Sequence, residues 1–257
     1  MNSYSVTGCI VTHNNMRTIK QTIETLLQNT KGVDFKLYVV DNLSTDGTPE
    51  FIKENYSNVE LIIPGDNKGF GAGHNKILNR LNSKYHAIIN PDISIEEDVI
   101  GKLAEFMDEN EDVGLASPRI CFPEGKEQIL GKRNPRPKYL LASRLRKGEN
   151  PSALLREYAM LDADISRPFD IENATGCFMF IRTDILKKLG GFDERYFMYF
   201  EDADLTRQVR KTNRAVFFPG ATVFHVWGRD SKRDFRLMLV HFKSMCRYFA
   251  KWRQHLK

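Results

Sequence analysis

The stretch Tyr85-His86-Ala87-Ile88-Ile89-Asn90-Pro91-Asp92 decides how the rest of the chain is interpreted. Its apolar run at 87–89 predicts a short buried strand, and Pro91 cannot extend a central strand of a sheet. The strand therefore ends at Asn90 and brings Asp92 to the carboxyl edge of a sheet, where open α/β folds bind their ligands. A carboxylate beside an amide suits a hard divalent cation that also holds a diphosphate.

Asp92 has a second interpretation. Either Asp92 or Ser94 can cap the helix that the acidic run 96–98 opens, because carboxylate and hydroxyl oxygens accept hydrogen bonds from the first turn of a helix. The ligand site is favoured over the cap because polar segments containing Asp or Asn also follow other predicted strands.

Strands and helices alternate along the chain. Apolar runs predict strands at 6–12, 35–40, 59–63, 113–117, 175–181, 215–218 and 222–226. Helices are predicted from 19, from 49, through 77–81, over 99–107 and from 183 to Gly190-Gly191. This alternation implies βαβ units and a mostly parallel sheet in an α/β protein. Because polar segments follow at least four strands, the sequence predicts one binding crevice at their shared edge.

Composition sets broad limits on the protein. A chain of 257 residues, 41% apolar and 28% charged, is typical of one soluble domain with additions. It contains no apolar run long enough to span a bilayer, and its first residues lack a signal-peptide pattern. The four cysteines are scattered, and Cys9 and Cys177 lie in apolar runs. We therefore expect core thiols in a reducing cytosol rather than disulfides or a zinc site.

The positive charge is concentrated at the C-terminal end. Residues 232–257 contain eight Lys or Arg and one Asp, whereas the whole chain has a net charge of +5. We therefore divide the chain into a domain at 1–231 and a basic amphipathic helical tail at 232–257. An ideal helix from Phe235 has a broad apolar face made of Met238, Leu239, Phe242, Met245, Cys246, Phe249 and Trp252. Its neighbouring basic face is made of Arg236, Lys243, Arg247 and Lys251.

Two functions of this tail are open. An apolar stripe flanked by basic residues is typical of a helix that lies on an anionic membrane surface. The alternative is a helix packed on the preceding domain, as amphipathic helices usually are. A second basic segment, 132–147, has seven Lys or Arg, no acid, and prolines at 135 and 137. It is expected to be a long loop or insertion, either a solvated surface or a functional one.

An aromatic segment leads directly into an acidic one at 192–205. Glu201, Asp202 and Asp204 lie at the start of a predicted helix, where acids also favour the helix dipole. Apolar surroundings raise the pKa of a carboxyl group towards the range of a general base. We therefore treat these acids as candidates for catalysis, and His225 and Trp227 as late candidates near the end of the domain.

The glycines at 69, 71 and 73 do not indicate a dinucleotide site. Their spacing, with Asp92 about twenty residues on, resembles the dinucleotide fingerprint, but His74 occupies the position of the last glycine. The fingerprint also belongs in the first βα unit of a sheet, not in the third. Hydride transfer is therefore not favoured.

The chain resembles family-2 glycosyltransferases of the GT-A fold, in particular the rhamnosyltransferase branch, from about residue 6 to 231. The motifs that carry the resemblance are Val40-Asp41-Asn42-x-Ser44-x-Asp46-Gly47, Asn67-x-Gly69-x-Gly71-x-Gly73-x-Asn75, Asn90-Pro91-Asp92, Gly191-Phe192-Asp193-Glu194 and Phe200-Glu201-Asp202-x-Asp204-Leu205. It implies a doubly wound sheet with a Rossmann-like nucleotide-binding half joined to an acceptor-binding half.

The resemblance also implies roles for individual residues. Those expected to bind the nucleotide-sugar donor are Thr12, Asn14, Asp41, Asn67, Gly69, Asn75, Asn90 and Asp92. Among them, Asp41 is expected to bind the pyrimidine N3–H, and Gly69 to let the backbone approach the donor. Asp92, with His225 as a further ligand, is expected to hold Mg²⁺ or Mn²⁺ on the diphosphate. Asn90 replaces the first Asp of the commoner Asp-x-Asp pattern.

The same resemblance assigns Asp202 as the general base, and Glu201, Asp204 and Trp227 as structural or acceptor-positioning groups. It implies an inverting transfer of one sugar per encounter, since the Gln-x-x-Arg-Trp motif of processive relatives is absent. The expected donor is dTDP-rhamnose, with UDP-sugars next. The expected acceptor is a glycan on a polyprenyl diphosphate, in cell-surface polysaccharide synthesis at the cytoplasmic leaflet. No nucleic-acid partner is expected.

Two alternatives to this function come from other classes of protein. A sugar-1-phosphate nucleotidyltransferase shares a doubly wound sheet, but it needs a Gly-rich basic loop where this chain has His13-Asn14-Asn15. A non-catalytic nucleotide-sugar-binding subunit keeps the fold without activity. The presence of Asp92, Asp202 and His225 argues against that second alternative.

Overall fold

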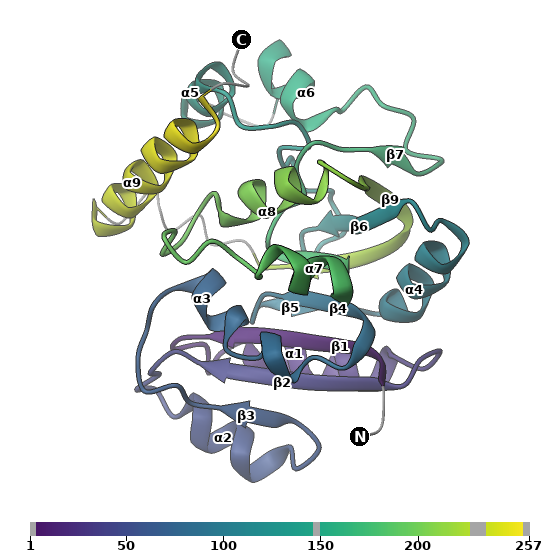
Figure 1. The fold of residues 1–257 in the computed structure, drawn as a ribbon, viewed down its shortest axis with the longest axis vertical. Coiled ribbons are helices and arrows are strands. Elements are labelled where there is room, and N and C mark those ends of the chain that lie inside the picture. The colour runs from purple at the N-terminus through teal and green to yellow at the C-terminus, as the bar shows by residue number, and fades with distance from the viewer. Residues whose placement is uncertain (1–3, 146–149, 227–234, 254–257) are drawn as a thin grey trace.

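The computed structural model describes residues 4–145, 150–226 and 235–253, and Figure 1 shows a central sheet with helices on both faces. The strands are β1 (Tyr4–Thr12), β2 (Phe35–Asp41), β3 (Glu60–Ile62), β4 (Ser83–Ile89), β5 (Ile93–Ser94), β6 (Val113–Cys121), β7 (Phe169–Asp170), β8 (Phe178–Arg182) and β9 (Arg214–His225). The helices are α1 (Ile19–Asn29), α2 (Thr48–Asn55), α3 (Phe70–Asn75), α4 (Val99–Glu109), α5 (Pro137–Leu145), α6 (Ala153–Ala159), α7 (Thr183–Leu189), α8 (Glu201–Val209) and α9 (Phe235–Lys251).

The described strands form one sheet in the order β3-β2-β1-β4-β8-β6-β9-β5, with β7 paired to β9. Strands β1 to β4 are parallel to their neighbours among themselves, which confirms the predicted α/β fold. Strand β8 then inserts antiparallel between β4 and β6, and β9 runs parallel to β6. The two strands predicted at 215–218 and 222–226 form one strand, β9, whose register shifts between them.

Side chains that alternate along the strands form two hydrophobic cores on the two faces of the sheet. Ile10 and Ile89 pack with α1 and α4 in one core. Cys9 and Ile88 pack with α7 and α8 in the other. Cys9 and Cys177 are buried free thiols, as expected.

Two local predictions are wrong. The segment 132–147, expected to be a loop, contains α5, because Pro137 occupies the first helical position, where no backbone N–H is needed. The helix expected through 77–81 is replaced by the short α3 and a 3₁₀ turn at Leu78–Arg80. Glycines lower helix propensity, which is consistent with the shortness of α3.

Helix α9 packs on the domain through only part of the predicted apolar face. Tyr248 of α9 and Trp252, directly after its end, join Tyr196 and Phe200 in a third core. The predicted apolar face is too broad to be buried as a whole, so Trp252 faces the domain whereas Leu239, Phe242 and Cys246 remain exposed. No helix in the described ranges is long and apolar enough to cross a bilayer.

Candidate active site

The carboxyl ends of β1, β2 and β4 carry the predicted donor residues to one edge of the sheet. Thr12 and Asp41 are register partners at the ends of β1 and β2. Asp41 is buried, and its Oδ1 accepts a hydrogen bond from the Ser44 backbone N–H at 2.8 Å. Its Oδ2 has no hydrogen-bond partner among the described residues. Because an unpaired buried carboxylate oxygen is costly, this atom indicates a site for a ligand N–H donor.

The loops after β1 and β2 are tied together by Asn14. The Asn14 backbone N–H donates to Ser44 Oγ, and Asn14 Oδ1 accepts from the Thr45 N–H, both at 2.8 Å. Thr12 Oγ1 donates to Asn15 Oδ1 at 3.0 Å. These bonds shape the edge beside Asp41, and direct contact of Thr12 and Asn14 with the donor stays a prediction.

The glycine loop before α3 packs against the aromatic segment of the acceptor half. Asn67 Oδ1 accepts from the Gly69 N–H at 3.1 Å, and Gly69 has a φ of +97°. A Cβ on Gly69 would overlap the carbonyl oxygen of Phe197, which also accepts from the Phe70 N–H at 2.9 Å. Gly69 is therefore required by a close approach within the protein itself, in addition to any approach of the donor.

Asn75 has a structural role that differs from the predicted one. Its amide donates to the Phe192 carbonyl at 2.9 Å and to Glu194 Oε1 at 3.1 Å, and its Oδ1 accepts from the Phe192 N–H at 2.9 Å. The side chain thus holds the loop 192–194 against α3. Contact of Asn75 with the donor sugar stays a prediction.

Asp92 and His225 lie together, as the sequence predicted for a shared metal site. Strand β5 pairs with the end of β9 so that Ile93 is the register partner of His225. His225 Nε2 lies 3.4 Å from Asp92 Oδ1. The helix that follows is capped by Asp98, whose Oδ1 accepts from the Gly101 N–H at 2.9 Å. The alternative in which Asp92 or Ser94 caps this helix is therefore wrong.

Gln128 determines which ring nitrogen of His225 carries the proton in the neutral imidazole. Its amide nitrogen donates to the carbonyl oxygens of His225 at 2.7 Å and of Cys121 at 3.3 Å, so its Oε1 faces His225 Nδ1 at 3.1 Å. An amide oxygen only accepts, and Nδ1 therefore carries the proton. Nε2 then presents its lone pair towards Asp92, as metal-ligating histidines do.

The donor atoms of this pair fit a divalent cation. Asp92 Oδ1 is buried without a hydrogen-bond partner, and it faces the lone pair of His225 Nε2. A proton on His225 Nε2, or a cation beside both atoms, would offset the repulsion between two electron-rich atoms at 3.4 Å. No group of three or more His, Cys, Asp or Glu side chains suited to a metal exists within the described ranges. Asp92 and His225 are therefore two candidate ligands, and diphosphate oxygens and water suit the further positions around such a cation.

Strand β8 brings Asp202 close to this pair. The Asn90 N–H donates to the Cys177 carbonyl at 2.9 Å, which joins the end of β4 to the start of β8. The preceding Gly176 N–H donates to Asp202 Oδ2 at 2.9 Å, and Asp202 Oδ1 accepts from the Ala203 N–H at 2.8 Å. The candidate base is therefore two hydrogen bonds away from the strand end that carries Asp92.

The pKa values of the neighbouring carboxyl groups of Glu201 and Asp202 are both raised. Burial raises the pKa of both carboxyl groups, and backbone N–H donors oppose this shift at each of them. Burial and then the charge of Asp202 raise the pKa of Glu201 to about 8. At neutral pH Glu201 therefore holds a proton, and Asp202 is the candidate to accept one in the reaction.

The Glu201 shift predicts a pH-dependent stability. Because folding raises this pKa, the folded protein loses stability relative to the unfolded chain as pH rises from about 4.5 to about 8. Glu201→Gln should remove a loss on the order of a few kcal/mol, measured by urea denaturation at pH 5 and pH 8.5. Exposed Glu109→Gln should leave the profile unchanged. Parallel profiles for Glu201→Gln and the unmodified protein would contradict the assignment.

The backbone is strained directly before these acids. Tyr199 and Phe200, neither a glycine, have φ values of +73° and +69° at the N-terminal end of α8. Such conformations cost about 1–3 kcal/mol each and cluster at functional sites. Their position next to Glu201 and Asp202 therefore supports this end of α8 as part of the active site.

Asp204 does not face the site. It is fully buried, with Oδ1 accepting from Trp252 Nε1 at 2.8 Å and Oδ2 accepting from Lys251 Nζ at 2.7 Å and Gln208 Nε2 at 2.9 Å. These bonds support the structural role of Asp204, and a part in positioning the acceptor stays a prediction. Trp227, the other predicted acceptor residue, lies outside the described residues.

Three contributors to the site were missed from the sequence. Gln128 orients His225, Gly176 holds Asp202, and the left-handed pair 199–200 turns the chain into α8. Gln128 and Gly176 belong to none of the quoted motifs, and each of the three acts through a partner that is distant in sequence or through backbone conformation. No sequence signal identifies them.

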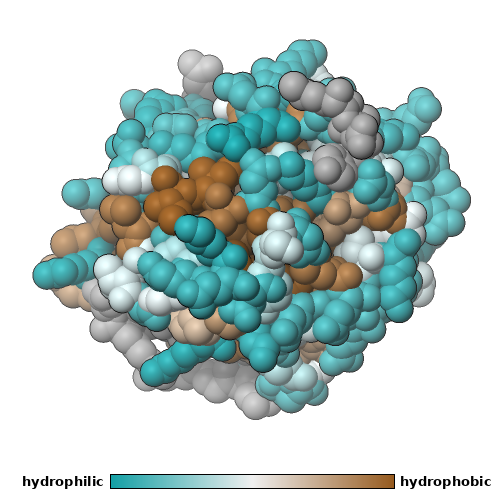
Figure 2. Space-filling model, turned by 90° about the horizontal axis from the view of Figure 1, so that it is seen from below, coloured by the Kyte–Doolittle hydropathy of each residue, from teal (hydrophilic) through white to brown (hydrophobic). Residues whose placement is uncertain are grey.

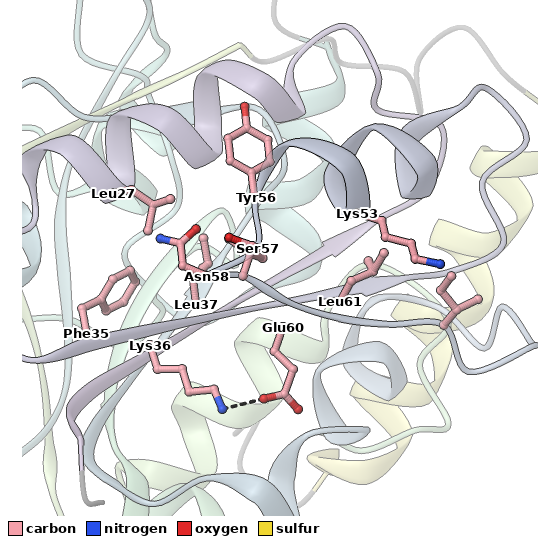
Figure 3. A pocket seen from close by; sticks show the side chains of 12 residues that line it. Leu27, Phe35, Lys36, Leu37, Lys53, Tyr56, Ser57, Asn58, Glu60 and Leu61 are labelled. Carbon is pink, nitrogen blue, oxygen red and sulfur yellow. Dashed lines mark ion pairs between the residues drawn. The ribbon is translucent and has the colours of Figure 1, made fainter.

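A hollow of about 940 Å³ lies elsewhere, at the β2–β3 edge of the sheet. The face seen from below, on the side of α2 and β3, has hydrophobic areas among hydrophilic ones (Figure 2). Side chains such as Tyr56 and Leu61 line the hollow, and Lys36 Nζ pairs with Glu60 Oε2 at 2.5 Å (Figure 3). Since none of the predicted site residues lines it, this hollow is not the active site.

A parallel sheet edge that carries Asp41 and Asp92, followed by an antiparallel strand beside Asp202, is consistent with the fold of GT-A glycosyltransferases. Residues 7–190 match the family model described as glycosyl transferase family 2. The chain belongs to this family and is a glycosyltransferase.

Curated relatives and solved structures agree with this class. The chain is 28% identical to an N-acetylglucosaminyl-diphospho-decaprenol L-rhamnosyltransferase of Mycobacterium tuberculosis, over 82% of this chain and 73% of the relative. It is 25% identical to the rhamnosyltransferase WbbL of Escherichia coli, over 95% and 92%. The mannosyltransferase PcManGT of Pyrobaculum calidifontis, solved with GDP-Man and Mn²⁺, has a TM-score of 0.67 and 16% identity, covering 99% of this chain and 65% of its own. This chain therefore spans slightly less than two thirds of that solved chain, whose likeness shows the fold.

Proposed function

We propose that the protein transfers one rhamnose from dTDP-rhamnose to a hydroxyl group of a lipid-linked glycan, with inversion at the anomeric carbon. The observation that carries the proposal is the proximity of Asp92, His225 and Asp202 at one sheet edge, beside Asp41 with its unpaired oxygen. The sugar and the acceptor are supported by two rhamnosyltransferase relatives, one of them named for a diphospho-decaprenol acceptor.

Each residue has a defined task in this reaction. Asp41 Oδ2 accepts the N3–H of a pyrimidine base, which orients the nucleotide. Asp92 and His225 would hold Mg²⁺ or Mn²⁺, which as a Lewis acid neutralises the charge on the leaving diphosphate. Asp202 takes the proton of the acceptor hydroxyl as the new C–O bond forms at the anomeric carbon and the bond to diphosphate breaks. One base opposite the leaving group makes this a single displacement, which inverts the centre.

A UDP-sugar is the second candidate donor, because uracil and thymine present the same N3–H to Asp41. Incubation with a panel of dTDP- and UDP-sugars and a polyprenyl-diphosphate-linked GlcNAc acceptor tests both. We expect acceptor-dependent release of dTDP from dTDP-rhamnose. Release of UDP from a UDP-sugar, without release of dTDP from dTDP-rhamnose, would identify a UDP-sugar as the donor. Binding of nucleotide sugars without release of nucleoside diphosphate would indicate a non-catalytic subunit. The acceptor proposal places the reaction at the cytoplasmic leaflet, in cell-surface polysaccharide synthesis.

Transfer is expected to require a divalent metal, and Gln128 is expected to raise the affinity for that metal. Chelation with EDTA should abolish transfer, and Mg²⁺ or Mn²⁺ should restore it. Gln128→Ala removes the group that orients His225, so metal affinity should fall by about 10–100-fold, measured as the Mn²⁺ concentration for half-maximal donor binding. Gln21→Ala, at an exposed position on α1, is the control and should change nothing. Full activity in EDTA would refute the metal site. Metal bound by Asp92 with His225 distant, in a donor complex, would refute the second ligand.

A further inference from the structure

Helix α9 exposes an apolar stripe on the side that faces away from the domain. Phe235, Leu239 and Phe242 are 66%, 45% and 56% exposed, and their spacing places them on one face of the helix. Tyr248 and Trp252, which are buried against the domain, occupy the opposite side. The stripe therefore lies outside the contact between α9 and the domain.

Basic side chains flank this stripe on both sides. Arg236, Lys243 and Arg247 are exposed along one flank of α9. On the other flank lies α5, whose Arg144 Nη2 contacts Met238 Sδ at 3.0 Å. Neither helix contains an acidic residue. The face thus combines exposed apolar side chains with basic side chains from two helices that contain no acid.

Helix α5 extends the apolar area. It lies beside α9 (Figure 1), and its Leu140 packs against the core that holds Tyr248 and Trp252. Leu141 and Leu145, one helical turn apart, are 60% and 67% exposed. We name the exposed residues Leu141, Leu145, Phe235, Leu239 and Phe242, with Arg144, Arg236, Lys243 and Arg247, the α5–α9 face.

We propose that the α5–α9 face docks on an anionic lipid surface. Apolar side chains that enter the headgroup region, together with basic side chains that attract anionic headgroups, are what an interfacial helix requires. A second copy of the chain is a poorer occupant, because a twofold contact would bring the same basic flanks against each other. The lipid is thus the occupant that the charge favours.

Docking would also orient the active site. Lys251 at the end of α9 and Trp252 directly after it hold Asp204 of α8, and Asp202 lies in the first turn of α8. The general base therefore keeps a constant distance from the lipid surface. This consequence rests on the proposed lipid-linked acceptor, whereas vesicle binding itself does not.

Vesicle binding of the full chain tests the proposal. We expect binding to phosphatidylcholine vesicles that contain phosphatidylglycerol, weakening as salt rises, and little binding without phosphatidylglycerol. Lys243→Gln with Arg247→Gln should weaken binding by about 30-fold, from the loss of two charges. Leu239→Asp with Phe242→Asp should also weaken it. The matched controls are Lys20→Gln with Lys53→Gln, and Ile63→Asp with Ile165→Asp, at exposed positions elsewhere, and they should bind normally.

Several outcomes overturn the proposal. These are no binding to anionic vesicles at low salt, equal binding to neutral vesicles, or equal losses in the control variants. A dimer in light scattering that Leu239→Asp with Phe242→Asp dissociates, without vesicle binding, would make the face a contact between copies.

Activity separates this proposal from the proposed function. The α5–α9 face variants should keep transfer to a short-chain soluble acceptor and lose transfer to one embedded in anionic vesicles. Failure with both acceptors in the unmodified protein would refute the proposed function, and the vesicle result would stand by itself.

Discussion

Asp202→Asn is expected to lower turnover by at least ~10²-fold while donor binding survives. The amide keeps the shape of the side chain, and its oxygen still accepts from the Gly176 N–H, but it cannot take a proton from the acceptor hydroxyl. Single-turnover transfer measures the chemical step, and titration with nucleotide sugar measures binding.

Glu201→Gln is the matched control for this variant. Because Glu201 carries the proton at neutral pH, its replacement by an amide keeps the charge of the site, so transfer should persist. Since burial raises the pKa of Asp202, the unmodified enzyme should lose activity on the acid side as Asp202 is protonated. Normal transfer by Asp202→Asn and a large loss in Glu201→Gln would reverse the two roles.

Asp204→Ala is expected to lower the free energy of unfolding by about 3–5 kcal/mol, because it breaks a buried ion pair. The substitution leaves Trp252 Nε1, Lys251 Nζ and Gln208 Nε2 without their shared acceptor. Urea denaturation measures the loss, and limited proteolysis shows whether α9 is released from α8.

Asp112→Ala is the control for Asp204→Ala. Asp112 forms an exposed ion pair with Arg214 at 3.0 Å, and exposed pairs contribute about 0–1 kcal/mol. Unchanged stability of Asp204→Ala, together with lost transfer to acceptor, would return Asp204 to the acceptor site. Loss of both would follow if the release of α9 also displaces the first turn of α8.

The local pattern of residues was sufficient for the elements that meet at the site. Apolar runs that end in Asp41 and Asn90 predicted strands whose carboxyl ends share one edge, and the structure confirms both. Gly190 ends α7 in a left-handed conformation, as the Gly-Gly pair predicted. These features depend on hydrophobic periodicity and turn chemistry, which neighbouring residues express by themselves.

Three motif residues show what the sequence by itself left open. Asn75 and Phe192 are 117 positions apart, His225 and Gln128 are 97 apart, and Asp204 and Trp252 are 48 apart. The sequence identified Asn75, His225 and Asp204 as candidate site residues, but it did not identify the groups that their side chains contact. Only the tertiary structure decided that Asn75 holds a loop, that His225 presents Nε2 to Asp92, and that Asp204 anchors α9. The reason is physical: the role of a polar side chain depends on which donors and acceptors the folded chain places within about 3 Å of it, and no local periodicity encodes those partners.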